Sequence, residues 1–116
     1  MSVNIYDDMN KLESTLRKTD EYVAVKTAMA EVKSDEQARA LFESFREIQM
    51  NLQQKQMAGE EIEGDELEHA QKTAQLAQEN PKILAMLTAE MKLSELIEEV
   101  NRVVLKPIQD LYEGFN

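Results

Sequence analysis

Apolar side chains recur every three or four residues along most of this chain, which is the period of an amphipathic α-helix. Over residues 4–18 the apolar positions are Ile5, Met9, Leu12 and Leu16. A second helix, capped by Thr19 or Asp20, carries a broader stripe made of Tyr22, Val23, Val25, Met29 and Val32. Ala, Leu, Met, Glu, Gln and Lys dominate the composition, whereas β-branched and aromatic residues are sparse, so the pattern predicts helices.

The third predicted helix covers residues 35–58 and would be about 36 Å long. Ser34 followed by Gln37 fits a capping box at its start. Its apolar positions are Ala38, Leu41, Phe45, Ile48 and Leu52. A helix of this length with an apolar seam needs a partner helix. The acidic segment 59–68 contains two glycines and is therefore the predicted chain reversal.

Two further helices follow the reversal. The first covers residues 66–79, with Asp65 as its cap and with Leu67 and the small residues Ala70, Ala74 and Ala77 on its apolar face. Asn80 and Pro81 suit the cap and the first position of the next helix. The apolar positions of this last helix are Leu93, Ile97, Val100, Val104, Ile108 and Leu111. Pro107 should kink it or divide it near Lys106.

These elements predict an all-α fold of about five helices in a single domain over residues 1–116, with a long antiparallel helical hairpin and shorter N-terminal helices. The apolar seams exceed what the two short helices can cover in one subunit, which favours an oligomeric bundle, a homodimer or higher. The alternative is that the helices fold back on one another and leave no apolar patch. The residues expected in the core or at the oligomer interface are Leu41, Phe45, Ile48, Leu52, Ile97, Val100 and Val104.

Composition narrows the function classes. The chain has 116 residues, no Cys and a formal net charge of -10, from 13 basic and 23 acidic side chains. The absence of Cys excludes disulfides, thiolate catalysis and Cys-based metal sites. Negative charge and scattered basic residues argue against direct binding to nucleic acid or an anionic membrane, and no segment is apolar enough to span a bilayer. The acidic N-terminus does not resemble a signal peptide, so we expect a cytoplasmic protein.

Few residues suit catalysis or metal binding. His69 is the single histidine, and Glu66 precedes it with the Glu-x-x-His spacing of di-iron helical bundles, but those sites need a second copy of the motif and two more glutamates. None of the five serines lies in a nucleophile-elbow motif. We therefore predict no enzyme activity, no catalytic residue, no metal site and no cofactor. An alternative function is metal or small-ligand binding by the acidic turn and His69 across a subunit interface.

The end of the third helix is the candidate interaction surface. Met9, Met29 and Met91 fall on or beside apolar stripes and are predicted to lie in the core, whereas Met50 and Met57 lie off the main seam. The predicted surface consists of Met50, Gln53, Gln54, Gln56 and Met57. The alternative interpretation is a solvated helix end made of good helix-forming residues.

Three segments resemble a known family. They are Leu52-Gln-Gln-Lys-Gln-Met-Ala-Gly-Glu-Glu-Ile62, Ala70-Gln-Lys-Thr73 and Lys106-Pro-Ile-Gln-Asp-Leu-Tyr112. They look like the YheA branch of the YlbF/YmcA family of small helical proteins from Gram-positive bacteria, and the resemblance extends from Val3 to Tyr112. It implies an all-helical array with long antiparallel helices, assembled as a homodimer or higher oligomer.

The resemblance also implies a class of function. The relatives YlbF and YmcA act with YaaT as a complex that adjusts the endoribonuclease RNase Y, and so influence RNA processing and bacterial development. The iron-sulfur clusters of that complex depend on cysteines, which this chain lacks, so the cofactor is not carried over. The family implies no catalytic residues. We expect a helical interaction or adaptor protein with partners of the RNase Y, YlbF, YmcA or YaaT type.

Overall fold

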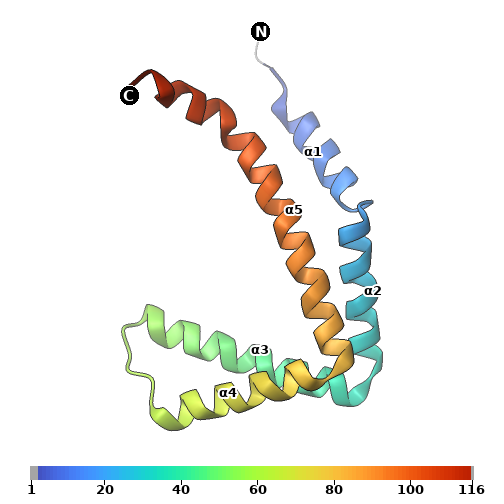
Figure 1. The fold of residues 1–116 in the computed structure, drawn as a ribbon, viewed down its shortest axis with the longest axis vertical. Helices are drawn as coiled ribbons and strands as arrows, with labels where there is room; N and C mark the ends of the chain where they lie inside the picture. Colours follow the sequence, from blue (N-terminus) through green and yellow to red (C-terminus); the bar gives the residue numbers. More distant parts are fainter. Residues whose placement is uncertain (1–2, 116) are drawn as a thin grey trace. The chain divides into compact units, whose positions relative to one another are not determined.

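The structure is a computed structural model that describes residues 3–115 of the chain. Over these residues the chain forms five α-helices, one short 3₁₀ helix and no strand (Figure 1). The elements are α1 (Ile5–Leu16), α2 (Asp20–Ser34), α3 (Glu36–Met57), α4 (Gly64–Glu79), α5 (Pro81–Tyr112) and the 3₁₀ helix η1 (Glu113–Phe115). The prediction of an all-α fold with about five helices is confirmed.

Side-chain caps define most of the helix starts. The Asn4 side chain accepts from the backbone N–H of Tyr6 at α1. Thr19 Oγ1 accepts from the N–H of Tyr22 at 3.2 Å and caps α2. Asn80 Oδ1 accepts from the backbone amides of the second and third residues of α5, at 3.0 and 3.2 Å. The predicted caps Thr19 and Asn80 are thus confirmed, since each satisfies amides that have no intrahelical partner.

Two predicted caps are wrong. Asp35, not Ser34, caps α3, because Asp35 Oδ1 accepts from the N–H of Ala38 at 3.1 Å. Ser34 is the last residue of α2, and its hydroxyl donates to the carbonyl of Glu31. Asp65 lies inside the first turn of α4, whose cap position is Glu63. Asp65 therefore acts on α4 only as a negative charge near the positive helix end.

The chain divides into two compact units, which are described separately. The first unit contains residues 3–25 and 88–115, that is α1, the first turns of α2 and most of α5. The second unit, residues 26–87, contains the rest of α2, all of α3 and α4, and the first turns of α5. A single domain over residues 1–116 stays a prediction.

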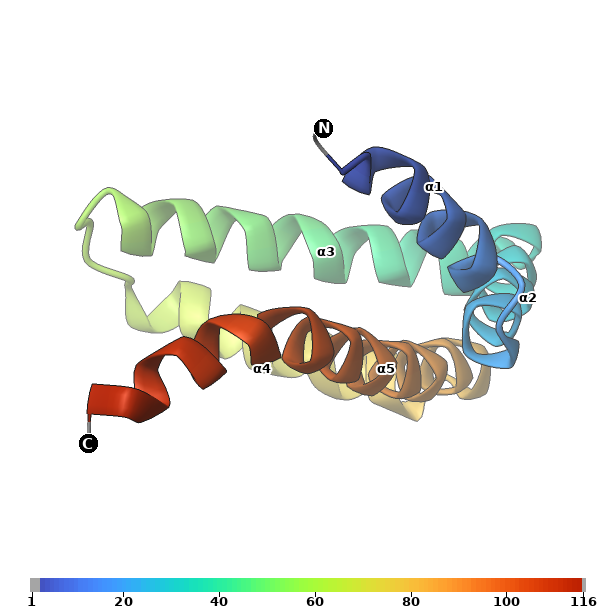
Figure 2. The same cartoon turned by 90° about the horizontal axis from the view of Figure 1, so that it is seen from above.

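The second unit contains the core. Within it, α3 and α4 pack side by side as an antiparallel hairpin joined by residues 58–63 (Figures 1 and 2). The buried cluster consists of Val32, Ala38, Ala77, Ile83 and Met86, with Ala28, Met29, Leu41, Phe42, Phe45 and Leu87 packed against it. The small side chains of Ala38 and Ala77 are fully buried, as expected where helices approach closely.

The first unit buries little of its apolar surface. Of the described residues in this unit, only Val25 is buried. Its α5 segment continues through Pro107 to Tyr112, so the proline does not divide the helix, although the ribbon bends over its last turns (Figure 1). Within residues 3–115, no helix combines the length and the apolar character that crossing a membrane requires.

Candidate interaction surfaces

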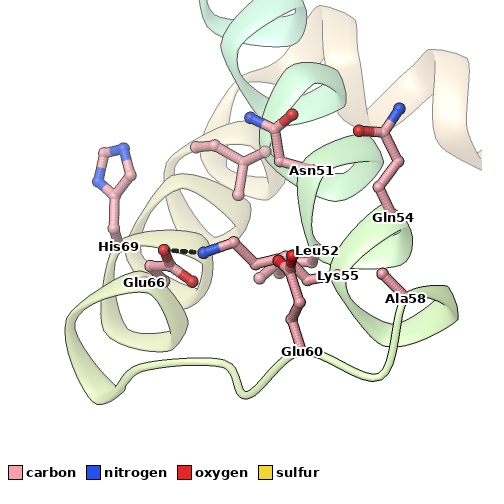
Figure 3. Close-up of a pocket in the computed structure, with 9 residues that line it drawn as sticks. Asn51, Leu52, Gln54, Lys55, Ala58, Glu60, Glu66 and His69 are labelled. Atoms are coloured by element: carbon pink, nitrogen blue, oxygen red, sulfur yellow. Dashed lines mark hydrogen bonds and ion pairs between the residues drawn. The ribbon is translucent and has the colours of Figure 1, made fainter.

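A pocket lies between α3 and α4 near the linker that joins them, and we call it the hairpin-end pocket (Figure 3). Its volume is about 610 Å³, within the range of small-ligand sites. Apolar, amide and charged side chains line it, among them Ile48, Leu52, Asn51, Gln54, Lys55 and Glu66. Most of these residues come from α3, where a spacing of three or four residues places them on one side of the helix.

An ion pair crosses the hairpin-end pocket. Lys55 Nζ donates to Glu66 Oε1, so the cation of α3 is paired with an anion of α4 (Figure 3). The hydrogen bond to Glu66 is the main cause that raises the pKa of Lys55, and the negative charges of Glu66, Glu60 and Glu63 add to it. Glu66 Oε2 is buried and has no hydrogen-bond partner in the described structure. The ion pair therefore neutralises the two charges at the pocket and joins the two helices of the hairpin.

The pocket does not assemble the predicted alternative ligand pair within one subunit. The His69 ring points away from the Lys55–Glu66 pair (Figure 3). Glu66 instead pairs through one carboxylate oxygen with Lys55. Residues 3–115 contain no group of three or more His, Asp or Glu side chains placed to hold a metal ion. A metal site shared between two subunits stays a prediction.

The predicted interaction surface lies at the exposed end of α3. Met50 is 52% exposed and Met57 is 82% exposed, and all three glutamines of the surface are exposed. Of these residues, Gln54 lines the hairpin-end pocket, whereas Gln53, Gln56 and Met57 do not. Sequence reasoning missed Asn51 and Lys55, and it named Glu66 only as part of the Glu-x-x-His motif, not as the partner of Lys55. The sequence signal for the ion pair between Lys55 and Glu66 was the single lysine in the Gln-rich run, because this run is joined by the turn to the acidic start of the next helix.

The predicted seam residues fall in both units. Leu41 and Phe45 pack against the core of the second unit, while Ile48 and Leu52 line the hairpin-end pocket. In the first unit, Ile97 and Val100 are half-buried and Val104 is 60% exposed. Part of the seam is therefore core, and Val104 is free to contact another molecule.

The first unit exposes two apolar helix faces, which we call the α1 face and the α5 face. The α1 face consists of Ile5, Met9 and Leu12, and the α5 face consists of Val104, Ile108 and Leu111. The spacing within each face is four and three residues, the spacing of a helix seam that packs against a second helix. Met9 and Met91 are more than half exposed, so their prediction as core residues is wrong, whereas Met29 packs against the core as predicted. The spacing of Met9 and Met91 places each of them on an apolar helix face, but nothing in the described chain covers these two side chains.

The solvent-accessible area of the chain is also larger than expected for compact proteins of the same length. The chain exposes 9724 Å². Two separate compact proteins with the lengths of the two units would together expose roughly 7,800 Å², so the excess is roughly 1,900 Å². A standard protein–protein interface buries about 800 Å² on each partner. The excess area is therefore larger than the area that one partner contributes to such an interface.

These features define a class: an all-α protein with a packed helical hairpin and a second set of helices whose apolar faces are exposed. Residues 5–109 match the profile of the Com_YlbF family, described as "Control of competence regulator ComK, YlbF/YmcA". The chain belongs to this family, which confirms the resemblance found in the sequence. The family is one of regulators and uncharacterised proteins rather than of enzymes.

Named relatives and solved structures agree with this assignment. A UPF0342 protein from Lysinibacillus sphaericus is 61% identical over 111 residues, which is 96% of each chain. One from Staphylococcus epidermidis is 46% identical over 97% of this chain and 98% of its own. The fold is similar to that of yheA from Bacillus subtilis, with a TM-score of 0.74 and 35% identity over 95% of this chain and 100% of that one. A "Protein of Unknown Function (DUF964)" from Bacillus stearothermophilus has a TM-score of 0.88, also at 35% identity, over 97% of this chain and 98% of that one.

Proposed function

We propose that this chain is a non-enzymatic interaction protein that self-associates through the α1 and α5 faces of its first unit. The observation that carries the proposal is the exposure of the α5 face, where Val104, Ile108 and Leu111 are 60%, 52% and 74% exposed at helix-seam spacing. Leaving such a face in water costs free energy, roughly 25 cal/mol for each Å² of apolar surface. We assign a second copy as the occupant, because the excess area of roughly 1,900 Å² exceeds the roughly 800 Å² that each partner contributes to a standard interface.

The charge of the chain is compatible with this assembly. Two copies of a chain with net charge -10 repel each other, so apolar contact must supply the attraction. The α1 and α5 faces consist of uncharged residues. Salt screens the repulsion without weakening apolar contact, so self-association should strengthen as ionic strength rises from about 0.01 to 0.15 M.

The second part of the proposal is an adaptor role. In the YlbF/YmcA relatives, the resemblance implied regulation of RNase Y-dependent RNA processing together with YaaT. Membership of a family described by competence control supports a related regulatory role here, exerted through protein partners rather than through direct binding of RNA. The end of α3, with Met50, Gln54 and Met57 exposed, is the surface offered to such a partner.

Self-association is tested by sedimentation velocity over a wide range of protein concentrations. Val104→Asp places a charge on the α5 face, and Gln109→Asp places the same charge about 140° around the same helix. Both residues are exposed, so neither variant disturbs the core. We expect an oligomer for the unmodified protein and Gln109→Asp, and a monomer for Val104→Asp. A monomer at every concentration for the unmodified protein would refute self-association.

The adaptor role is tested by tagging the protein in a native host and identifying co-purifying proteins by mass spectrometry at moderate salt. The comparison variant is Gln53→Ala/Gln54→Ala/Gln56→Ala, which changes exposed residues of α3 and leaves the core intact. We expect YlbF-type proteins or RNase Y with the unmodified chain and their loss with the variant. Recovery of the same partners with both would move the contact surface away from the end of α3.

A further inference from the structure

A second groove lies within the second unit, on a surface that includes α2 and α3, and we call it the α2–α3 groove. Its volume is about 470 Å³. Its apolar lining consists of Met29, Val32, Phe42, Met50 and Met86. Three of these five side chains are methionines, whose unbranched thioethers adapt to differently shaped apolar partners. Such a lining is typical of grooves that receive the apolar face of a helix.

Basic side chains surround this groove in a chain that is acidic overall. Lys33, Arg39 and Arg46 line it together with Glu43 and Glu47, so the local charge is positive although the net charge of the chain is -10. All three basic residues are exposed. None of them takes part in an ion pair within residues 3–115, where the ion pairs involve Arg17, Lys55 and Lys82. The groove therefore has unpaired cations beside an apolar floor.

The positions along α3 set the dimensions of a complementary partner. Arg39 and Arg46 are one heptad apart, so they lie on the same side of α3 about 10.5 Å from each other along its axis. The lining on α3 runs from Arg39 to Gln54, which corresponds to about 22 Å of helix. A partner helix of roughly 15 residues spans this length, and two of its carboxylates seven residues apart would match the arginine spacing.

We propose that the α2–α3 groove binds an amphipathic helix of a partner protein, with large apolar residues on one face and acidic residues along the edge of that face. The apolar residues enter the methionine-lined floor, and the carboxylates pair with Arg39 and Arg46. This inference rests on the proposed role as an interaction protein, but it does not rest on self-association. At about 0.15 M salt the Debye length is near 8 Å, so the charges at the groove outweigh the more distant acidic residues.

The test is fluorescence anisotropy with a labelled, designed helical peptide of about 18 residues. The peptide carries leucines at helix-seam spacing and two glutamates seven residues apart beside them, and a second peptide carries lysines in place of the glutamates. We expect saturable binding of the glutamate peptide. The affinity for the lysine peptide should be lower by at least roughly tenfold. Arg39→Glu/Arg46→Glu should reverse this preference. The control Lys92→Glu/Arg102→Glu changes the net charge equally in the first unit and should keep it.

Two further measurements keep the outcome decisive. Met50→Ala removes a half-exposed side chain of the groove and should weaken binding of both peptides without changing the helix content measured by circular dichroism. The peptide of residues 3–18 of this chain is also tested, since it is amphipathic and carries acidic side chains, although its net charge is zero. The proposal is overturned if no designed peptide binds, if both bind equally, or if only the 3–18 peptide binds, because the groove would then join two copies of the chain.

The two proposals can fail separately. Arg39→Glu/Arg46→Glu should sediment like the unmodified protein, because these residues do not belong to the α1 or α5 face. Val104→Asp should dissociate the oligomer and still bind the glutamate peptide. Loss of peptide binding in Val104→Asp would mean that the groove depends on self-association, which contradicts a groove that binds its partner independently.

Discussion

Replacement of Ile83 by alanine tests where the stability of this protein resides. Ile83 is fully buried in the cluster formed by α2, α3, α4 and the start of α5. Alanine removes three carbon atoms, which lose about 2.4 kcal/mol of transfer free energy at roughly 0.8 kcal/mol per methylene. The cavity that remains adds to this loss, and the better helix propensity of alanine offsets about 0.4 kcal/mol. The free energy of unfolding should therefore fall by about 3 kcal/mol.

The measurement is urea unfolding followed by circular dichroism at a fixed protein concentration. A loss of about 3 kcal/mol moves the urea midpoint down by roughly 1–3 M, depending on the slope of the transition. Ile83→Val, which removes one carbon atom, should cost about 1 kcal/mol. The matched control is Leu84→Ala, one residue further along α5, because Leu84 is 48% exposed. It should cost about 1 kcal/mol or less.

The comparison between neighbours decides the outcome. If Ile83→Ala and Leu84→Ala destabilise the protein equally, burial in the second-unit cluster is not the source of stability. A loss for Ile83→Ala of less than about 1 kcal/mol would contradict the assignment of a packed cluster at this position.

Two other substitutions test the backbone and the caps. Gly59 has a φ of 73°, so Gly59→Ala should lower the free energy of unfolding by about 1–2 kcal/mol. Gly64 lies at a helix start, and no atom lies close to where a Cβ would be, so Gly64→Ala should be neutral or stabilising. The pKa of Asp35 lies below its ordinary value, mainly because its carboxylate accepts from the amide of Ala38 and also because it accepts from the ammonium of Lys82. Asp35 therefore stabilises the fold above about pH 4. This contribution is lost as the pH falls through the lowered pKa. Asp35→Ala should lower the urea midpoint at pH 7 but not near pH 2. The control Ser34→Ala should leave the urea midpoint unchanged at both pH values. If Asp35→Ala lowered the midpoint equally at both pH values, this would contradict a lowered pKa of Asp35 in the folded state.

Periodicity predicts the helices of this chain well, because the spacing of apolar residues and the Asn80-Pro81 pair are local signals. The cap of α3 shows the limit of local signals. Ser34 and Asp35 both suit a helix cap, and the sequence pattern alone favoured Ser34. The structure uses Asp35, whose second carboxylate oxygen accepts from Lys82 Nζ at 3.0 Å, 47 residues away in the chain. That contact depends on tertiary structure and cannot be seen in a local window.

The candidate site was predictable only in part, for a related reason. The sequence placed Met50 and Gln54 on an exposed part of α3, which is where the structure has them. The ion pair between Lys55 and Glu66 joins residues on both sides of the turn, so it required the register of the hairpin. Periodicity also identified Met9 as part of an apolar face. Whether a subunit buries that face or exposes it depends on packing between helices, which the pattern does not contain.

The two units therefore differ in what stabilises them. The second unit has a buried cluster and a packed hairpin, so it can hold the end of α3 and the α2–α3 groove in shape without help. In the first unit, α1 has 12 residues, which is near the length below which an isolated helix is marginal in water. If a second copy covers the α1 and α5 faces as proposed, binding and helix formation in α1 are linked equilibria. The helix content of α1 should then rise with protein concentration, whereas the stability conferred by Ile83 should not depend on it.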